Sequence, residues 1–183
     1  MYECPWLAEA RKHLGQKEIY GPRHNPFIVG LWKFLGLPYR DDETPWCAGF
    51  VGGVLEKCKI KSSRSAMARS YQKWGVKIDR PIPGCIVVFW RGSPNGISGH
   101  VGFVTGLTRE GHLKVIGGNQ NDQVSEAVYA AKGQPGSRVL SYRWPLGINV
   151  PSEALAPTPE VKPTSVPTKK TWIKIPLTNI KED

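Results

Sequence analysis

Three residues, Cys47, His100 and Asn119, are of the types needed for nucleophilic chemistry at a sulfur atom. A cysteine thiolate is a strong nucleophile, and an imidazole with a pKa near neutrality can accept the proton of the thiol. An amide side chain can hydrogen-bond the other ring nitrogen and so fix the tautomer of the imidazole. Together these residues would suit cleavage of an amide bond through a covalent thioester.

Cys47 is expected in the first turn of a helix. Thr44 followed by Pro45 is a helix-start signal, and with Thr44 as the N-cap Cys47 is the third helical residue. Unpaired backbone N–H groups and the helix dipole favour an anion there, and the same N–H groups could help to hold an oxyanion. A small buried core residue is the alternative role for this cysteine.

The helix expected after Cys47 carries three glycines, each of which costs roughly 0.5–1 kcal/mol relative to alanine. Such a helix needs a compensating reason, and close approach of its backbone to a sheet would be one. The three are Gly49, Gly52 and Gly53.

His100 and Asn119 are expected on neighbouring strands. Residues 100–107 and 112–119 are separated by a short turn at 108–111, and in a hairpin of that length opposing residue numbers add to 219. His100 then lies directly across from Asn119, on the same face of the sheet, with Cβ atoms about 4.5–5.5 Å apart. A shift of register by two would place Asn121 there instead. Gln120 and Asp122 are the other candidates for this polar position.

Helical patterns precede strand patterns along the chain, which predicts an α+β fold with an antiparallel sheet. Helices are expected over residues 5–15, 25–36, 44–58 and 62–75, and strands over 85–90, 100–107, 112–118 and 138–144. A boundary near Pro151 separates a catalytic domain, residues 1–150, from residues 151–183. The latter segment has six prolines and no glycine, and it is interpreted as a linker and tail that could dock on a partner.

The chain carries a net charge of +10, and about +9 of it falls in residues 1–150. A basic domain favours an anionic partner, for which nucleic acid, anionic lipid and the bacterial cell wall all qualify, and solubility alone is the alternative explanation of the charge. The basic residues are scattered and no nucleic-acid-binding motif accompanies them, so no nucleic-acid partner is expected. No apolar run is long enough for a membrane span, and no signal peptide is apparent, so synthesis in the cytoplasm is expected.

The four cysteines lack the spacing of a zinc site, and no disulfide framework is expected, because three remain if Cys47 stays a thiol. Cys58 and Cys85 are interpreted as core residues.

Four fragments, TPWCAGFV, PGCIVVFW, SGHVGFV and IGGNQ, resemble in that order the NlpC-type and CHAP branch of papain-like peptidoglycan hydrolases. The likeness is closest to a subfamily common in phage and prophage lysis proteins, and it extends from about Trp6 to Pro145. It implies a papain-like fold with Cys47 as nucleophile, His100 as base and Asn119 as the third residue. It also implies cleavage of amide bonds in peptidoglycan, by an endopeptidase or an N-acetylmuramoyl-L-alanine amidase, without a metal or an organic cofactor.

The sequence departs from the pattern of the family next to the nucleophile. CHAP members often have glutamine there, where this chain has Trp46, so that Glu43, Asp42 or a backbone group would have to complete the oxyanion hole. The candidate substrate groove comprises Trp46, Trp90, Glu43 and Gln120, with core packing as the alternative role of the two tryptophans.

The sequence thus favours a bacteriolytic enzyme of phage type, either released from the cytoplasm at lysis or carried in a virion tail. Residues 151–183 would then bind phage tail proteins. The alternatives are a non-catalytic structural or wall-binding protein on the same fold, and a papain-like enzyme that acts on a protein substrate.

Overall fold

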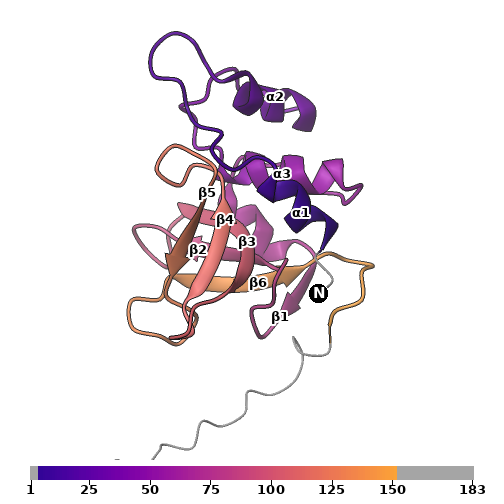
Figure 1. The fold of residues 1–183 in the computed structure, drawn as a ribbon, viewed down its shortest axis with the longest axis vertical. Coiled ribbons are helices and arrows are strands. Elements are labelled where there is room, and N and C mark those ends of the chain that lie inside the picture. Colours follow the sequence, from indigo (N-terminus) through magenta and orange to yellow (C-terminus); the bar gives the residue numbers. More distant parts are fainter. Residues whose placement is uncertain (1–3, 152–183) are drawn as a thin grey trace, which may run out of the picture.

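The computed structural model describes residues 4–151, and the expectations about residues 152–183 lie outside the described residues. Residues 4–151 form three helices, a short 3-10 helix and a six-stranded antiparallel sheet (Figure 1). The predicted α+β class is therefore confirmed. Within residues 4–151, no helix has the length and apolar character needed to cross a membrane.

The helices occupy the first half of the described chain. They are α1 (Pro5–Arg11), α2 (Pro26–Leu35), α3 (Cys47–Lys57) and the 3-10 helix η1 (Ala68–Lys73). The start signal at Asn25 holds, because its side chain accepts a hydrogen bond from the N–H of Phe27. The fourth predicted helix is wrong over most of its length, since only η1 forms within residues 62–75.

The sheet has the order β1-β6-β2-β3-β4-β5, with all neighbours antiparallel. The four predicted strands are present as β2, β3, β4 and β6, whereas β1 and β5 were not predicted. The bounds are β1 (Val76–Ile78), β2 (Ile86–Trp90), β3 (Gly99–Leu107), β4 (Leu113–Gly117), β5 (Ser125–Tyr129) and β6 (Val139–Trp144).

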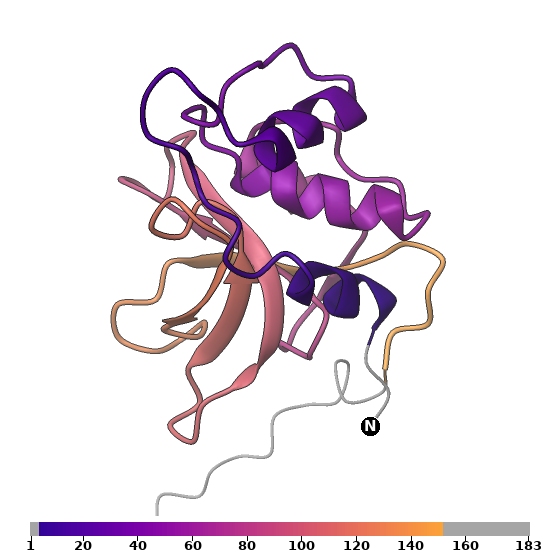
Figure 2. The same ribbon diagram turned by 45° about the horizontal axis from the view of Figure 1, so that its top comes forward.

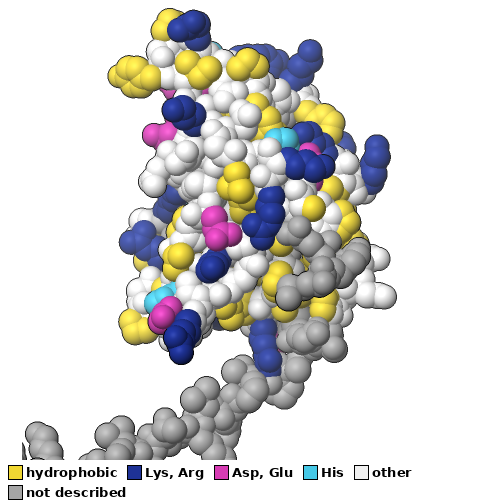
Figure 3. All heavy atoms as spheres, in the orientation of Figure 1, with side chains coloured by type: hydrophobic (Ala, Val, Ile, Leu, Met, Phe, Trp, Pro, Cys, Tyr) yellow, Lys and Arg dark blue, Asp and Glu magenta, His cyan; other side chains and the backbone are white. Residues whose placement is uncertain are grey.

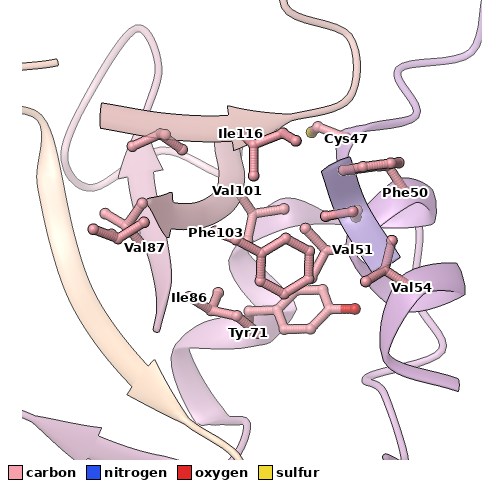
Figure 4. Packing of buried hydrophobic residues seen from close by; sticks show 14 of the residues in the cluster. Cys47, Phe50, Val51, Val54, Tyr71, Ile86, Val87, Val101, Phe103 and Ile116 are labelled. Atoms are coloured by element: carbon pink, nitrogen blue, oxygen red, sulfur yellow. The ribbon is translucent and has the colours of Figure 1, made fainter. Parts of the chain in front are cut away.

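Helix α3 lies between α2 and the strands, in the middle of the molecule (Figure 2). Val51 and Val54 on α3 and Val101 and Phe103 on β3 belong to one buried cluster (Figure 4). Cys47, at the start of α3, and Ile116, on β4, belong to the same cluster. The core therefore fixes the start of α3 against the middle strands of the sheet.

The glycines of α3 face α2 rather than the sheet, which corrects the expected reason for them. A Cβ added at Gly49 would lie 2.5 Å from the ring of Trp32, and one at Gly53 would lie 2.5 Å from Leu31. Real side-chain atoms do not approach so closely, and the lack of a Cβ is what lets α2 pack directly on α3.

Gly49→Ala should therefore destabilise the protein by about 1–3 kcal/mol, because the ring of Trp32 is held in the core and has no room to move. The matched control is Gly30→Ala on α2, where an added Cβ meets nothing within 4 Å. That change should stabilise the protein by about 0.4–1 kcal/mol. Denaturant unfolding of both variants checks the pair, and equal stabilities would contradict the packing argument.

Candidate active site

Cys47 is the first residue of α3, with Trp46 as the N-cap. The helix begins two residues later than predicted, because Asp41 Oδ1 accepts the N–H of Thr44 at 2.6 Å and closes a turn over residues 41–44. The predicted position at a helix N-terminus holds, although Cys47 is the first rather than the third helical residue. Its own N–H is thus among those without an intrahelical partner.

The Cys47 side chain reaches the surface through a cavity. The residue is only 5% exposed. It lines a cavity of about 540 Å³, together with Met67, Arg91 and Ile97, and this is called the Cys47 cavity below. The thiol therefore lies beneath an opening and is not sealed among core side chains.

His100 is the second residue of β3, and its ring is held by Gln120. Nε2 of the ring lies 3.0 Å from Oε1 of Gln120. Nε2 of Gln120 donates to the carbonyl oxygens of Ser125 at 2.6 Å and Val115 at 3.3 Å. The amide must therefore present its oxygen to the imidazole, so Nε2 of His100 carries the hydrogen.

The other ring nitrogen, Nδ1 of His100, is buried and has no hydrogen-bond partner among the described residues. Since Nε2 carries the hydrogen, Nδ1 has the lone pair of a neutral imidazole. Burial of an acceptor without a partner costs folding free energy, and a free lone pair is what a general base needs in order to accept a proton.

The predicted contact between Asn119 and His100 is replaced by a contact with Gln120, which was an alternative candidate for this position. The register that was predicted is present at Phe103 opposite Ile116, but β4 ends at Gly117. Asn119 then adopts a φ of 55°, so the chain turns instead of continuing along β3. That turn brings the side chain of Gln120, rather than that of Asn119, to the imidazole ring of His100.

Two aromatic side chains complete the surroundings of His100. The hydroxyl of Tyr129 donates to Oε1 of Gln120 at 2.9 Å, and the ring of Phe89 stacks on the imidazole at a centroid distance of 6.1 Å. Tyr129 was missed because β5 was not predicted. The available signal was weak: Val128 and Tyr129, which are of types favoured in strands, follow the turn-forming residues Asn121 and Asp122.

Burial governs the ionisation of both reactive groups. Burial raises the pKa of the Cys47 thiol, while a backbone N–H contact from Val101 and the charge of Arg91 act in the opposite direction. Burial lowers the pKa of His100 to about 4, although the hydrogen bond to Gln120 opposes this. Both groups are therefore neutral at pH 7, and the thiol needs a base to become a nucleophile.

The contact with Val101 places the sulfur beside the residue that follows His100 on β3. No hydrogen bond joins the thiol to Nδ1 in this structure. Catalytic hydrogen bonds are often long in free enzymes and shorten in the substrate complex.

The depressed pKa of His100 predicts an acid-sensitive stability. The folded state favours the neutral ring, whereas the unfolded chain can protonate it near the ordinary pKa of 6.5. The contribution of His100 to the free energy of unfolding is therefore complete above pH 6.5 and is lost as the pH falls towards about 4. A shift of this size corresponds to roughly 3 kcal/mol. Unfolding free energies measured between pH 7 and pH 4.5 should fall for the wild type and much less for His100→Gln. Parallel curves would contradict the depressed pKa.

The remaining candidates separate into core and groove residues. Trp46 is fully buried and its indole N–H donates to Glu18 Oε1 at 2.8 Å, so its expected place in the groove is wrong. Trp90 lines a cavity of about 240 Å³ with His100, Arg91, Tyr129 and Arg138, called the His100 cavity below.

Neither acidic candidate for the oxyanion hole points to the nucleophile. Asp42 is fully buried and accepts the N–H groups of Ile19 and Asn25. Glu43 is exposed and lines a separate cavity with Glu18 and Asp122. Of the possibilities raised by the sequence, a backbone group remains.

The comparison with protein families identifies the central part of the chain. Residues 39–119 match the CHAP domain, a segment that contains both Cys47 and His100. A search of curated proteins found no match. CHAP domains are typically cysteine- and histidine-dependent amidases or peptidases. Residues 39–119 are thus similar to a CHAP domain, and the antiparallel α+β fold is consistent with a CHAP papain-like fold.

Proposed function

We propose that the protein hydrolyses an amide bond in the peptide of peptidoglycan, with Cys47 as nucleophile and His100 as base. The observation that carries this proposal is the hydrogen bonding of His100, which assigns the hydrogen to Nε2 and leaves Nδ1 buried and without a partner. A buried acceptor without a partner is costly in a histidine that only fills the core, and the Cys47 sulfur contacts Val101, the next residue of β3.

In the proposed reaction, Nδ1 of His100 takes the proton of the Cys47 thiol as the sulfur attacks the carbonyl carbon. The amide C–N bond then breaks, and the imidazolium returns the proton to the leaving amine. A water molecule, activated by the neutral ring, cleaves the thioester and restores the thiol. Gln120 is a positioning residue, because it holds the ring through Nε2 and leaves Nδ1 to move the proton.

The oxyanion of the tetrahedral intermediate would be held by backbone N–H groups at the start of α3. Cys47 is the first residue of α3, so no carbonyl of a preceding helical turn accepts its N–H. The positive end of the helix dipole lies at the same end of α3. Trp46 cannot supply a side-chain donor, since its indole N–H is bonded to Glu18. The proposed hole therefore differs from that of relatives with glutamine at this position.

The setting proposed for this activity is lysis of a bacterium by a phage or prophage, with release from the cytoplasm or carriage in a virion. The support is the sequence resemblance to lysis proteins and the basic surface, whose lysines and arginines are spread over the face in Figure 3. A net charge of +10 would draw the enzyme to an anionic envelope. The proposed docking of residues 151–183 on tail proteins belongs to the same setting.

Mass spectrometry of purified peptidoglycan after digestion tests the proposal and identifies the bond. Wild type should release products with a newly formed amine and carboxylate, whereas Cys47→Ala should release none. A new lactyl carboxylate would indicate an amidase, and a new peptide terminus an endopeptidase. Intact amide bonds after prolonged digestion would contradict the proposal and favour a structural protein or an enzyme with another substrate.

A further inference from the structure

Arg91 stands between the two cavities of the candidate site. It follows β2 directly, it is exposed, and it lines both the Cys47 cavity and the His100 cavity. Its guanidinium makes no hydrogen bond or ion pair with any of the described residues, although its charge acts on both Cys47 and His100. A cation in this position is available to a ligand.

A second guanidinium lies on the wall of the His100 cavity. Arg138 is exposed, and its guanidinium carbon lies 5.3 Å from the centroid of the Trp90 ring. An arginine that lies over an aromatic face keeps its N–H groups free at the edge and loses little further freedom on binding. No acidic residue in the described part of the chain lines either cavity, so neither charge is neutralised there.

We propose that Arg91 and Arg138 bind a carboxylate of the substrate peptide in the His100 cavity. The planar fork of a guanidinium matches a carboxylate with two parallel hydrogen bonds. The inference deepens the proposed function, on which it rests, by stating that the preferred peptide carries a free acidic group next to the bond that is cleaved.

The sizes and linings of the two cavities support an acidic group on one side of the bond only. The His100 cavity, about 240 Å³, is smaller than an ordinary small-molecule site and suits one short side chain. The Cys47 cavity is about 540 Å³, and the exposed side chains of Met67 and Ile97 give it an apolar wall. A peptide that crosses Cys47 would therefore meet both guanidinium groups in the His100 cavity, and an apolar wall with the guanidinium of Arg91 alone in the Cys47 cavity.

The test is a binding titration that does not depend on turnover. Cys47→Ala protein is titrated calorimetrically with two soluble stem peptides of one sequence, which differ only in whether the α-carboxylate of glutamate is free or amidated. The free acid should bind about 10-fold to 100-fold more tightly, the range for hydrogen bonds to a charged group. Arg91→Gln or Arg138→Gln, each added to Cys47→Ala, should remove most of that difference.

Arg109→Gln is the matched control, because Arg109 is an exposed arginine in the β3–β4 turn and lines neither cavity. It should keep the full preference for the free acid. Equal affinity for the two peptides, or binding of neither, would overturn the inference even if the wild type cleaves peptidoglycan. A preference for the free acid without cleavage by the wild type would support the inference while the proposed hydrolysis fails.

Discussion

Cys47→Ser should lower kcat/KM on peptidoglycan by about 10³-fold or more, the scale on which loss of a nucleophile acts. A hydroxyl has a far higher pKa than a thiol, so His100 would ionise it far less readily. Serine is close to cysteine in size, so the fold and the two cavities should remain. Clearing of permeabilised cells and release of soluble muropeptides measure the effect.

Cys58→Ser is the matched control for that experiment. Cys58 is the C-cap of α3, at the opposite end of the same helix, and it is only half-buried. Activity within about twofold of wild type is expected there. Equal activity of Cys47→Ser and wild type would end the cysteine-hydrolase proposal, and equal losses in the two serine variants would point to damage to the helix instead.

The register of β3 and β4 shows how far the sequence could define the site. The short turn at 108–111 predicts residue 107 opposite residue 112, but Leu107 lies opposite Leu113. A register shift between Val104 and Gly106 then produces the predicted pairs, Val104 opposite Val115 and Phe103 opposite Ile116. Extending this register to Asn119 assumes that the strand continues, and strand ends depend on tertiary contacts more than on local pattern. A Cβ at Gly118 would lie 2.5 Å from the ring of Trp46, so the packing of α3 determines the backbone there.

The start of α3 shows a similar limit. Thr44 and Pro45 predict a helix in this region, and α3 begins at Cys47, although Trp46 rather than Thr44 is the N-cap and Pro45 precedes the helix. The exact start depends on Asp41, which accepts the N–H of Thr44 and holds residues 41–44 in a turn. Helix boundaries are commonly uncertain by one or two residues for this reason. The conclusion about Cys47 survives, because either start places it in the first turn.

The arginines beside the site could not have been found from the sequence. Arg91 and Arg138 are 47 residues apart and share no motif, and the fold brings them to one cavity. The pairing of β2 with β6 places the ends of both strands together, since Phe89 lies opposite Val139. Arg91 follows β2 and Arg138 precedes β6, so their proximity can be predicted only when the order of the strands is known.

Gln120→Ala should lower kcat/KM by about 10²-fold, because the neutral ring of His100 would lose the contact that fixes its tautomer. The change also leaves the buried Nε2 hydrogen and the hydroxyl of Tyr129 without their shared acceptor. Asn119→Gly is the matched control, since glycine accepts the positive φ of that position and only the side chain is lost. It should keep activity within a few-fold of wild type.

Gln120→Glu separates a positioning role from a merely structural one. A carboxylate that accepts the Nε2 hydrogen of His100 favours the charged ring and raises its pKa above about 4. Activity requires neutral His100, so the acid limb of the kcat/KM profile should move to higher pH in this variant. A lower kcat/KM with no shift of the acid limb would mean that Gln120 only fills space. Loss of activity in Asn119→Gly but not in Gln120→Ala would mean that Asn119, rather than Gln120, positions the imidazole.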